Sequence, residues 1–90
     1  MMNYRSKPVE IEAFRFYVDP IPDWFMDKVT TNEIILHDCN YRIDGNFAYC
    51  LITTPYGQMK GNAGDYIVKG VWDEIYPCKP DIFKQKYEKI

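Results

Sequence analysis

Turn-forming residues divide this chain of 90 residues into segments that are too short for long helices or strands. Clusters of proline, glycine, asparagine and aspartate occur at residues 19–23, 38–40, 44–45, 54–57 and 62–65. Residues of these types favour tight turns, and two short strands joined by a tight turn run antiparallel. The sequence therefore predicts a small fold that is built mainly from short antiparallel strands.

The segments between these turns have the composition of strands, which are expected at residues 9–13, 34–37, 41–43, 47–53, 58–60, 66–69 and 74–76. In the first strand, Val9, Ile11 and Ala13 alternate with glutamates, so these three side chains are expected to face the core. Phe14 and Phe16 have the opposite parity, which indicates a bulge or a strand end covered on both sides. Residues 47–53 are apolar on both parities, as is typical of a central strand covered on both faces.

Two short helices complete the predicted fold, one after Pro22 and one from Pro80 onward. Together these elements predict a single α+β domain over residues 1–90, with a small curled antiparallel β-sheet or a partly open barrel and two short helices. A domain of this size has a small core, so we expect a homo-oligomer. The helix side chains expected to pack inward are Trp24, Phe25, Val29, Ile82, Phe83 and Tyr87.

Charge and composition argue against several classes of protein. The formal net charge of −2 gives no basic surface for duplex nucleic acid, which is not an expected partner. No apolar run has the length of a membrane span, and no export signal follows the N-terminus, so we expect a cytoplasmic protein without a membrane partner. The three cysteines are widely spaced and predict neither a disulfide nor a zinc site. No cofactor is expected.

The candidate catalytic groups are weak. His37 and Cys39 would share one face of a strand, at a separation too long for a Cys–His nucleophile, so both are expected to be structural. Glu10 and Glu12 alternate with apolar residues, as on any solvent-facing side of a strand. Cys78 stands beside a lysine that would lower its pKa if exposed, but a structural role is favoured. The sequence therefore predicts a protein that is not an enzyme.

Aromatic and basic residues coincide in the predicted turns. A ring can stack on a base while a nearby cation neutralises a phosphate, which is the combination that a nucleotide site needs. The alternative is that tyrosine and tryptophan at hairpin turns cover the open end of a small barrel. The candidate ligand-binding residues are Tyr41, Arg42, Tyr56, Lys60, Lys69, Trp72, Tyr76 and Lys79.

Two segments of the chain have a distinctive sequence. The first is KPVEIEA at residues 7–13, and the second comprises GDYIVKGV at residues 64–71 and YPCKPDIF at residues 76–83. These segments resemble the two ends of a family of small proteins encoded by tailed phages and prophages. The chain departs from the family pattern at Ala63, where the family commonly has proline, and at Asp73, where it commonly has glycine. The resemblance implies a phage origin, and it supplies no reaction and no catalytic residues.

This context leads to two expectations about function. The first is a non-catalytic protein that sequesters a small anionic nucleotide, used by the host as a defence signal, in a pocket between subunits of a homo-oligomer. The second is a protein–protein inhibitor of a host defence factor, or an accessory subunit of the phage particle. Exposed aromatic residues and an isoelectric point near 5.3 suit this second function equally well.

Overall fold

The computed structural model describes residues 10–37 and 48–87 of the chain. These residues form β1 (Glu12–Arg15), α1 (Asp23–Thr30), β2 (Ile34–His37), β3 (Tyr49–Thr54), β4 (Gly57–Asn62), β5 (Tyr66–Lys69), β6 (Ile75–Cys78) and α2 (Pro80–Lys86). The strand expected at residues 41–43 lies outside the described residues, as does Val9.

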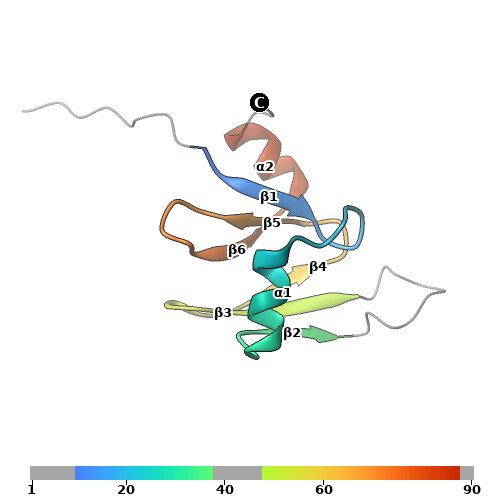
Figure 1. Cartoon of the computed structure of the whole chain (residues 1–90). Coiled ribbons are helices and arrows are strands. Elements are labelled where there is room, and N and C mark those ends of the chain that lie inside the picture. Colours follow the sequence, from blue (N-terminus) through green and yellow to red (C-terminus); the bar gives the residue numbers. More distant parts are fainter. Residues whose placement is uncertain (1–9, 38–47, 88–90) are drawn as a thin grey trace, which may run out of the picture.

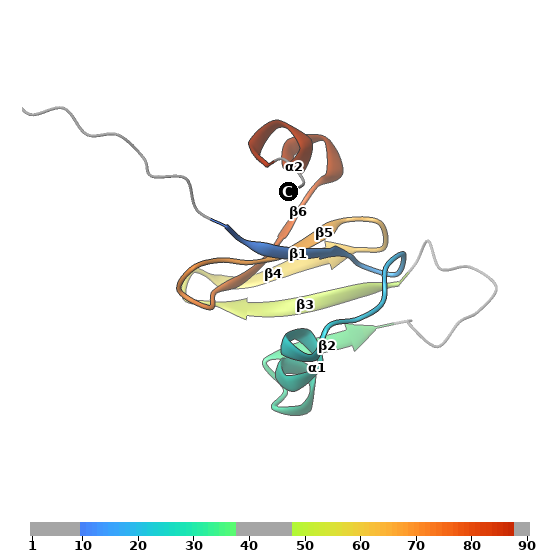
Figure 2. The same ribbon diagram turned by 45° about the horizontal axis from the view of Figure 1, so that its top comes forward.

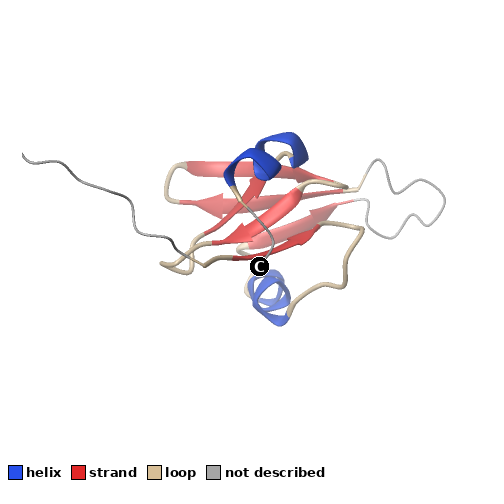
Figure 3. Cartoon of the chain, turned by 90° about the horizontal axis from the view of Figure 1, so that it is seen from above, coloured by secondary structure: helices blue, strands red, loops and turns tan. Residues whose placement is uncertain are grey.

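The strands of the described residues form two antiparallel sheets (Figure 1). Sheet A has the strand order β1-β5-β6, and sheet B has the order β2-β3-β4. The two helices lie apart, on different sides of the strands (Figure 3). The predicted α+β class, with antiparallel strands and two short helices, is confirmed. The strands divide between two sheets, however, and these do not close into a barrel.

The hydrophobic core lies between the two sheets. Phe14 and Ile67 are paired across β1 and β5 of sheet A, and both are buried. Phenylalanine buries a large apolar area for one residue, which suits a chain that has few positions for core side chains. The buried cluster contains Phe14, Phe16, Phe25, Ile34, Cys50, Ile52 and Ile67.

Helix α1 connects the edge strand β1 of sheet A with the edge strand β2 of sheet B, and it covers this side of the core. The ring of Phe25 is fully buried and meets the ring of Phe14 edge-on at 5.0 Å. Trp24 packs against Phe14 at 5.7 Å. Lys28 forms an ion pair of 2.9 Å with Glu33, which stands just before β2. The predicted amphipathic helix and its inward-facing aromatic residues are therefore confirmed.

Gly61 of β4 allows sheet B to approach sheet A closely. A methyl group at this position would come within 3.0 Å of both Sγ of Cys50 and Cδ1 of Ile67, and within 3.3 Å of Cβ of Pro77. Ile67 and Pro77 belong to β5 and β6 of sheet A, so a side chain at Gly61 would press on the opposite sheet. No residue larger than glycine fits here without a shift of its neighbours.

Helix α2 packs on the other face of sheet A. The ring of Phe83 stacks on the ring of Tyr66 at 3.9 Å, and the hydroxyl groups of Tyr76 and Tyr87 are 2.8 Å apart. The guanidinium group of Arg15 lies 5.5 Å from the centre of the Tyr66 ring. The expected inward packing of Phe83 and Tyr87 is thus correct, whereas Ile82 is exposed, because it lies on the side of the helix that faces away from the sheet.

Two expectations about strand faces are wrong. Ala13 is exposed, and the buried residues of the first strand and its extension are Phe14 and Phe16, because the larger rings take the core face. In β3, Cys50 and Ile52 are buried, but Leu51 on the opposite face is only half-buried. The central strand of sheet B is therefore fully covered on one face alone.

Left-handed backbone conformations occur at several turn residues, among them Gly64 and Asp73. Gly64 has a φ of 92°, and the turn around it is held by the Asp65 carboxylate, which accepts a hydrogen bond of 3.0 Å from the backbone N–H of Asn62. Asp73 has a φ of 61° in the β5–β6 turn. Glycine adopts this conformation without steric cost, whereas aspartate is strained in it.

We expect Gly61→Ala to lower the free energy of unfolding by about 1–3 kcal/mol, as overpacking of a close contact does. Urea denaturation followed by far-UV circular dichroism measures this loss. Gln58→Ala, on an exposed part of the same strand, is the matched control and should change stability little. If Gly61→Ala and the wild type unfold at the same urea concentration, the close approach of the two sheets is contradicted.

We further expect Asp73→Gly to be more stable than Asp73→Ala by about 1 kcal/mol, because only glycine relieves the left-handed strain. Both variants remove the 3.6 Å ion pair between Lys69 and Asp73. The difference in stability between them therefore reports the backbone strain at residue 73 alone. Thermal unfolding of the two variants measures it. Equal melting temperatures would show that the turn does not hold this conformation.

Candidate functional site

The described residues enclose a pocket of about 760 Å³. It lies where the tips of the β3–β4 and β5–β6 hairpins, one from each sheet, stand on the same side of the molecule (Figure 2). The α1–β2 junction forms a third wall, through Lys28 and Glu33. Ile34, Ile52, Met59 and Ile75 contribute apolar surface to the lining.

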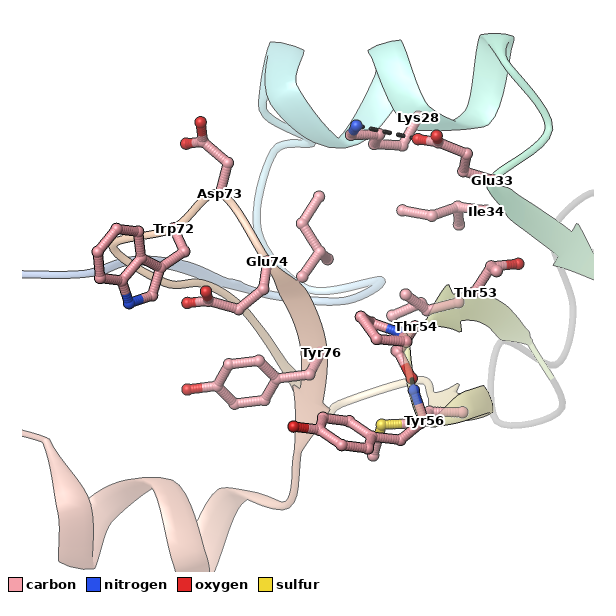
Figure 4. A pocket seen from close by; sticks show the side chains of 14 residues that line it. Lys28, Glu33, Ile34, Thr53, Thr54, Tyr56, Trp72, Asp73, Glu74 and Tyr76 are labelled. Atoms are coloured by element: carbon pink, nitrogen blue, oxygen red, sulfur yellow. Dashed lines mark hydrogen bonds and ion pairs between the residues drawn. The ribbon is translucent and has the colours of Figure 1, made fainter.

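Three aromatic residues line this pocket, and Figure 4 shows how they lie. Tyr56 occupies the β3–β4 turn and is 98% exposed, while Trp72 occupies the β5–β6 turn and is 86% exposed. Tyr76 is half-buried on β6, between these two turns and α2. The Tyr56 turn is held by the hydroxyl group of Thr54, which accepts a hydrogen bond of 3.1 Å from the Tyr56 N–H and donates one of 2.6 Å to the carbonyl of Gly57.

The charges of the pocket lining are mostly negative. Glu33, Asp73 and Glu74 contribute three carboxylates against the single lysine Lys28. Lys28 is paired with Glu33, and Asp73 lies 3.6 Å from the amino group of Lys69. Among the described residues, Glu74 has no ion pair. The pocket therefore combines exposed rings with a carboxylate that no cation of the described chain neutralises.

The Tyr76 hydroxyl group stays protonated at any physiological pH. Burial raises the pKa of Tyr76 above its ordinary value, and the hydrogen bond with the Tyr87 hydroxyl group and the negative charge of Glu74 raise it further. Tyr76 therefore enters the pocket as a neutral phenol.

Of the eight predicted ligand-binding residues, the structure brings Tyr56, Trp72 and Tyr76 together in this pocket. Tyr41 and Arg42 lie outside the described residues. The three predicted lysines Lys60, Lys69 and Lys79 are not among the residues that line the pocket.

Each of these lysines has another environment. Lys60 lies over the ring of Tyr49 at 4.4 Å, on the face of sheet B that points away from the core. Lys69 forms ion pairs with Glu12 at 3.7 Å and with Asp73. Lys79 directly precedes α2, and its side chain is exposed. The amino groups that would neutralise phosphates therefore do not line the pocket.

The acidic side of the site was missed by sequence reasoning. Asp73 and Glu74 directly follow Trp72 in the sequence, and this adjacency could have indicated a negative charge beside the ring. Lys28 and Glu33 reach the pocket only because α1 folds back beside the hairpin tips, which no local pattern indicates.

The other candidate sites carry no chemistry in the described part of the chain. The imidazole of His37 stacks on the ring of Tyr49 at 4.8 Å, and Cys39 lies outside the described residues. No group of three or more histidine, cysteine or acidic residues among those described has an arrangement that could hold a metal ion. Neither of the described helices has the length or apolarity that a membrane crossing requires.

Comparisons with protein-family models, with curated proteins and with solved structures find no significant match to this chain. The resemblance to small phage proteins therefore depends on the two sequence segments alone.

Cys78 provides a test of the structural role assigned to it. Burial raises the pKa of this thiol, and this effect outweighs the opposing influence of Lys86. Because less thiolate is present at neutral pH, iodoacetamide should label Cys78 slowly in the folded protein and rapidly after denaturation. Mass spectrometry of a Cys39→Ser variant, in which Cys50 and Cys78 remain, measures the rate. Labelling of folded Cys78 as fast as that of a free thiol would show that it is reactive.

Proposed function

We propose that this protein is a non-catalytic accessory protein of a tailed phage that acts by docking another protein in the pocket between its two hairpin tips. The observation that carries the proposal is the exposure of Trp72 and Tyr56, which project from turns and contribute little to the core. Large exposed rings that line one hollow are typical anchors of protein interfaces.

The pocket suits a binding role more than a catalytic one. Its described lining contains neither cysteine nor histidine, the residues that most often act as a nucleophile or as a general base. The apolar side chains of Met59 and Ile75, which are not fully buried, would instead contact an inserted side chain. In size, the pocket falls within the range of sites that bind a small ligand or a few residues of a partner.

The phage context supports an accessory role. The second of the segments that resemble phage proteins covers β5 and continues from β6 into α2, so its two parts flank the turn of Trp72 and include Tyr76. Small phage proteins without an active site commonly act by occupying a component of the host or of the phage particle. A host defence factor in the cytoplasm and a virion protein are the two classes of partner that this proposal covers.

Sequestration of a nucleotide signal remains a prediction of the sequence. The rings of Trp72 and Tyr56 are accessible for stacking on a base. The phosphates, however, would meet Glu74 and Asp73, and the one lysine of the lining is already paired. A nucleotide site would therefore require a second copy of the chain to supply cations, which is why we place protein docking first.

The proposal is tested with tagged full-length protein in bacterial lysate, comparing the wild type with a Trp72→Ala/Tyr56→Ala double variant. Because both rings are exposed, the double variant should fold normally and lose the retained partner. Val71→Ala/Ile82→Ala, which truncates two other exposed apolar residues, is the control and should retain it.

A panel of cyclic nucleotides and ADP-ribose derivatives, added during thermal unfolding of the purified protein, distinguishes the two functions. We expect no rise in melting temperature with any of these compounds. A rise that disappears in the double variant, together with failure to retain any protein specifically, would replace protein docking by nucleotide sequestration.

A further inference from the structure

The wall of the pocket formed by the β5–β6 hairpin combines aromatic faces with a negative charge. Glu74 projects into the space beside Trp72 and Tyr76, as Figure 4 shows. Aromatic faces carry a partial negative charge and attract cations, and a carboxylate beside them adds to this attraction. The wall therefore has the electrostatic character of a site for a positively charged group.

Glu74 is the carboxylate most available to a ligand. The two other acidic residues of the lining already have cationic partners, Glu33 at 2.9 Å from Lys28 and Asp73 at 3.6 Å from Lys69. Glu74 is half-buried and has no such partner among the described residues. A partly buried carboxylate without a counter-charge favours the binding of a cation that restores one.

Gly70 positions this carboxylate. A methyl group at Gly70 would overlap the carboxylate and Cδ of Glu74, so the side chain of Glu74 lies directly over this glycine. The backbone supports the same arrangement, because the Gly70 N–H donates a hydrogen bond of 2.9 Å to the carbonyl of Glu74. The absence of a side chain at residue 70 thus leaves room for the charge at the pocket wall.

We propose that the pocket receives a lysine or arginine side chain of the protein partner, with its cationic group beside Glu74 and its alkyl chain against Trp72 and Tyr76. This inference rests on the proposed function and specifies the chemistry of the partner. The apolar lining formed by Met59 and Ile75 suits aliphatic residues that flank the cation in the partner's sequence.

Charge complementarity selects this occupant over the alternatives. An acidic segment would be repelled by Glu74 and Asp73, and a purely apolar segment would leave the carboxylate of Glu74 without a partner. A basic residue with aliphatic neighbours satisfies both parts of the lining.

The test uses short acetylated and amidated peptides of sequence Gly-Leu-X-Leu-Gly, in which X is lysine, arginine, norleucine or glutamate. Each is titrated into the full-length, isotopically labelled chain, and the indole N–H signal of Trp72 is followed by NMR. Trp24, the other tryptophan, packs on Phe14 outside the pocket lining and is the internal control. Norleucine matches the aliphatic part of lysine without its charge.

We expect the lysine and arginine peptides to shift the Trp72 signal and to bind about three- to tenfold more tightly than the norleucine peptide, with the glutamate peptide weakest. Glu74→Gln and Gly70→Ala should both remove this preference, the first by loss of the charge and the second by its displacement. Asp81→Asn, which removes one carboxylate of α2 outside the pocket lining, should keep it.

The outcomes separate this inference from the proposed function. If the norleucine peptide shifts Trp72 as strongly as the lysine and arginine peptides, or if Glu74→Gln retains the preference for charge, the inference is overturned while the pocket remains a docking site. If no peptide shifts Trp72 at millimolar concentration, the inference is again overturned. Protein docking itself fails if the Trp72→Ala/Tyr56→Ala variant still retains the wild-type partner from lysate, or if no protein is retained specifically while a nucleotide raises the melting temperature of the wild type.

Discussion

The structure depends on one shared core between two sheets, neither of which could bury enough apolar surface alone. Sheets of three short strands are close to the minimum for independent stability. In this protein, the two sheets are joined on two sides of the core by different contacts. On one side, Phe25 of α1 joins the phenylalanines that extend from β1. On the other, Gly61 allows β4 to contact Ile67 and Pro77 of sheet A.

The pocket is a consequence of this arrangement. The buried cluster joins the sheets near the middle of the strands, while the β3–β4 and β5–β6 hairpins extend beyond it (Figure 2). Between their tips the sheets no longer contact each other fully, so Tyr56 and Trp72 remain exposed. A small domain gains little stability from rings in such positions, and their exposure favours association. Rings of this kind are better explained by binding than by folding.

Much of the fold could be predicted from local patterns, because turn residues and short apolar segments act within a few positions of one another. The expected strands at residues 34–37 and 66–69 have the observed bounds, and α1 packs through Trp24 and Phe25 as expected. The face of β1 could not be predicted in this way. Ile11 and Ala13 have the right alternation, but Phe14 and Phe16 meet Phe25, a contact between distant residues that local alternation does not contain.

The candidate site shows the same limit in its charges. Tyr56, Trp72 and Tyr76 could be identified because aromatic residues in or beside predicted turns are recognisable in a sequence. The sign of the charge beside these rings depends instead on which side chains the fold brings near. Lys69 is three residues from Trp72, yet its amino group pairs with Glu12 and Asp73. Glu74 instead stands at the rings, over a glycine that leaves it room. If lysines stood beside these three rings, the site would suit a nucleotide. With carboxylates beside them, it suits a basic side chain, so the proposed ligand depends on how the β5–β6 hairpin packs. Only a second copy that placed its own lysines at this wall would reverse that choice.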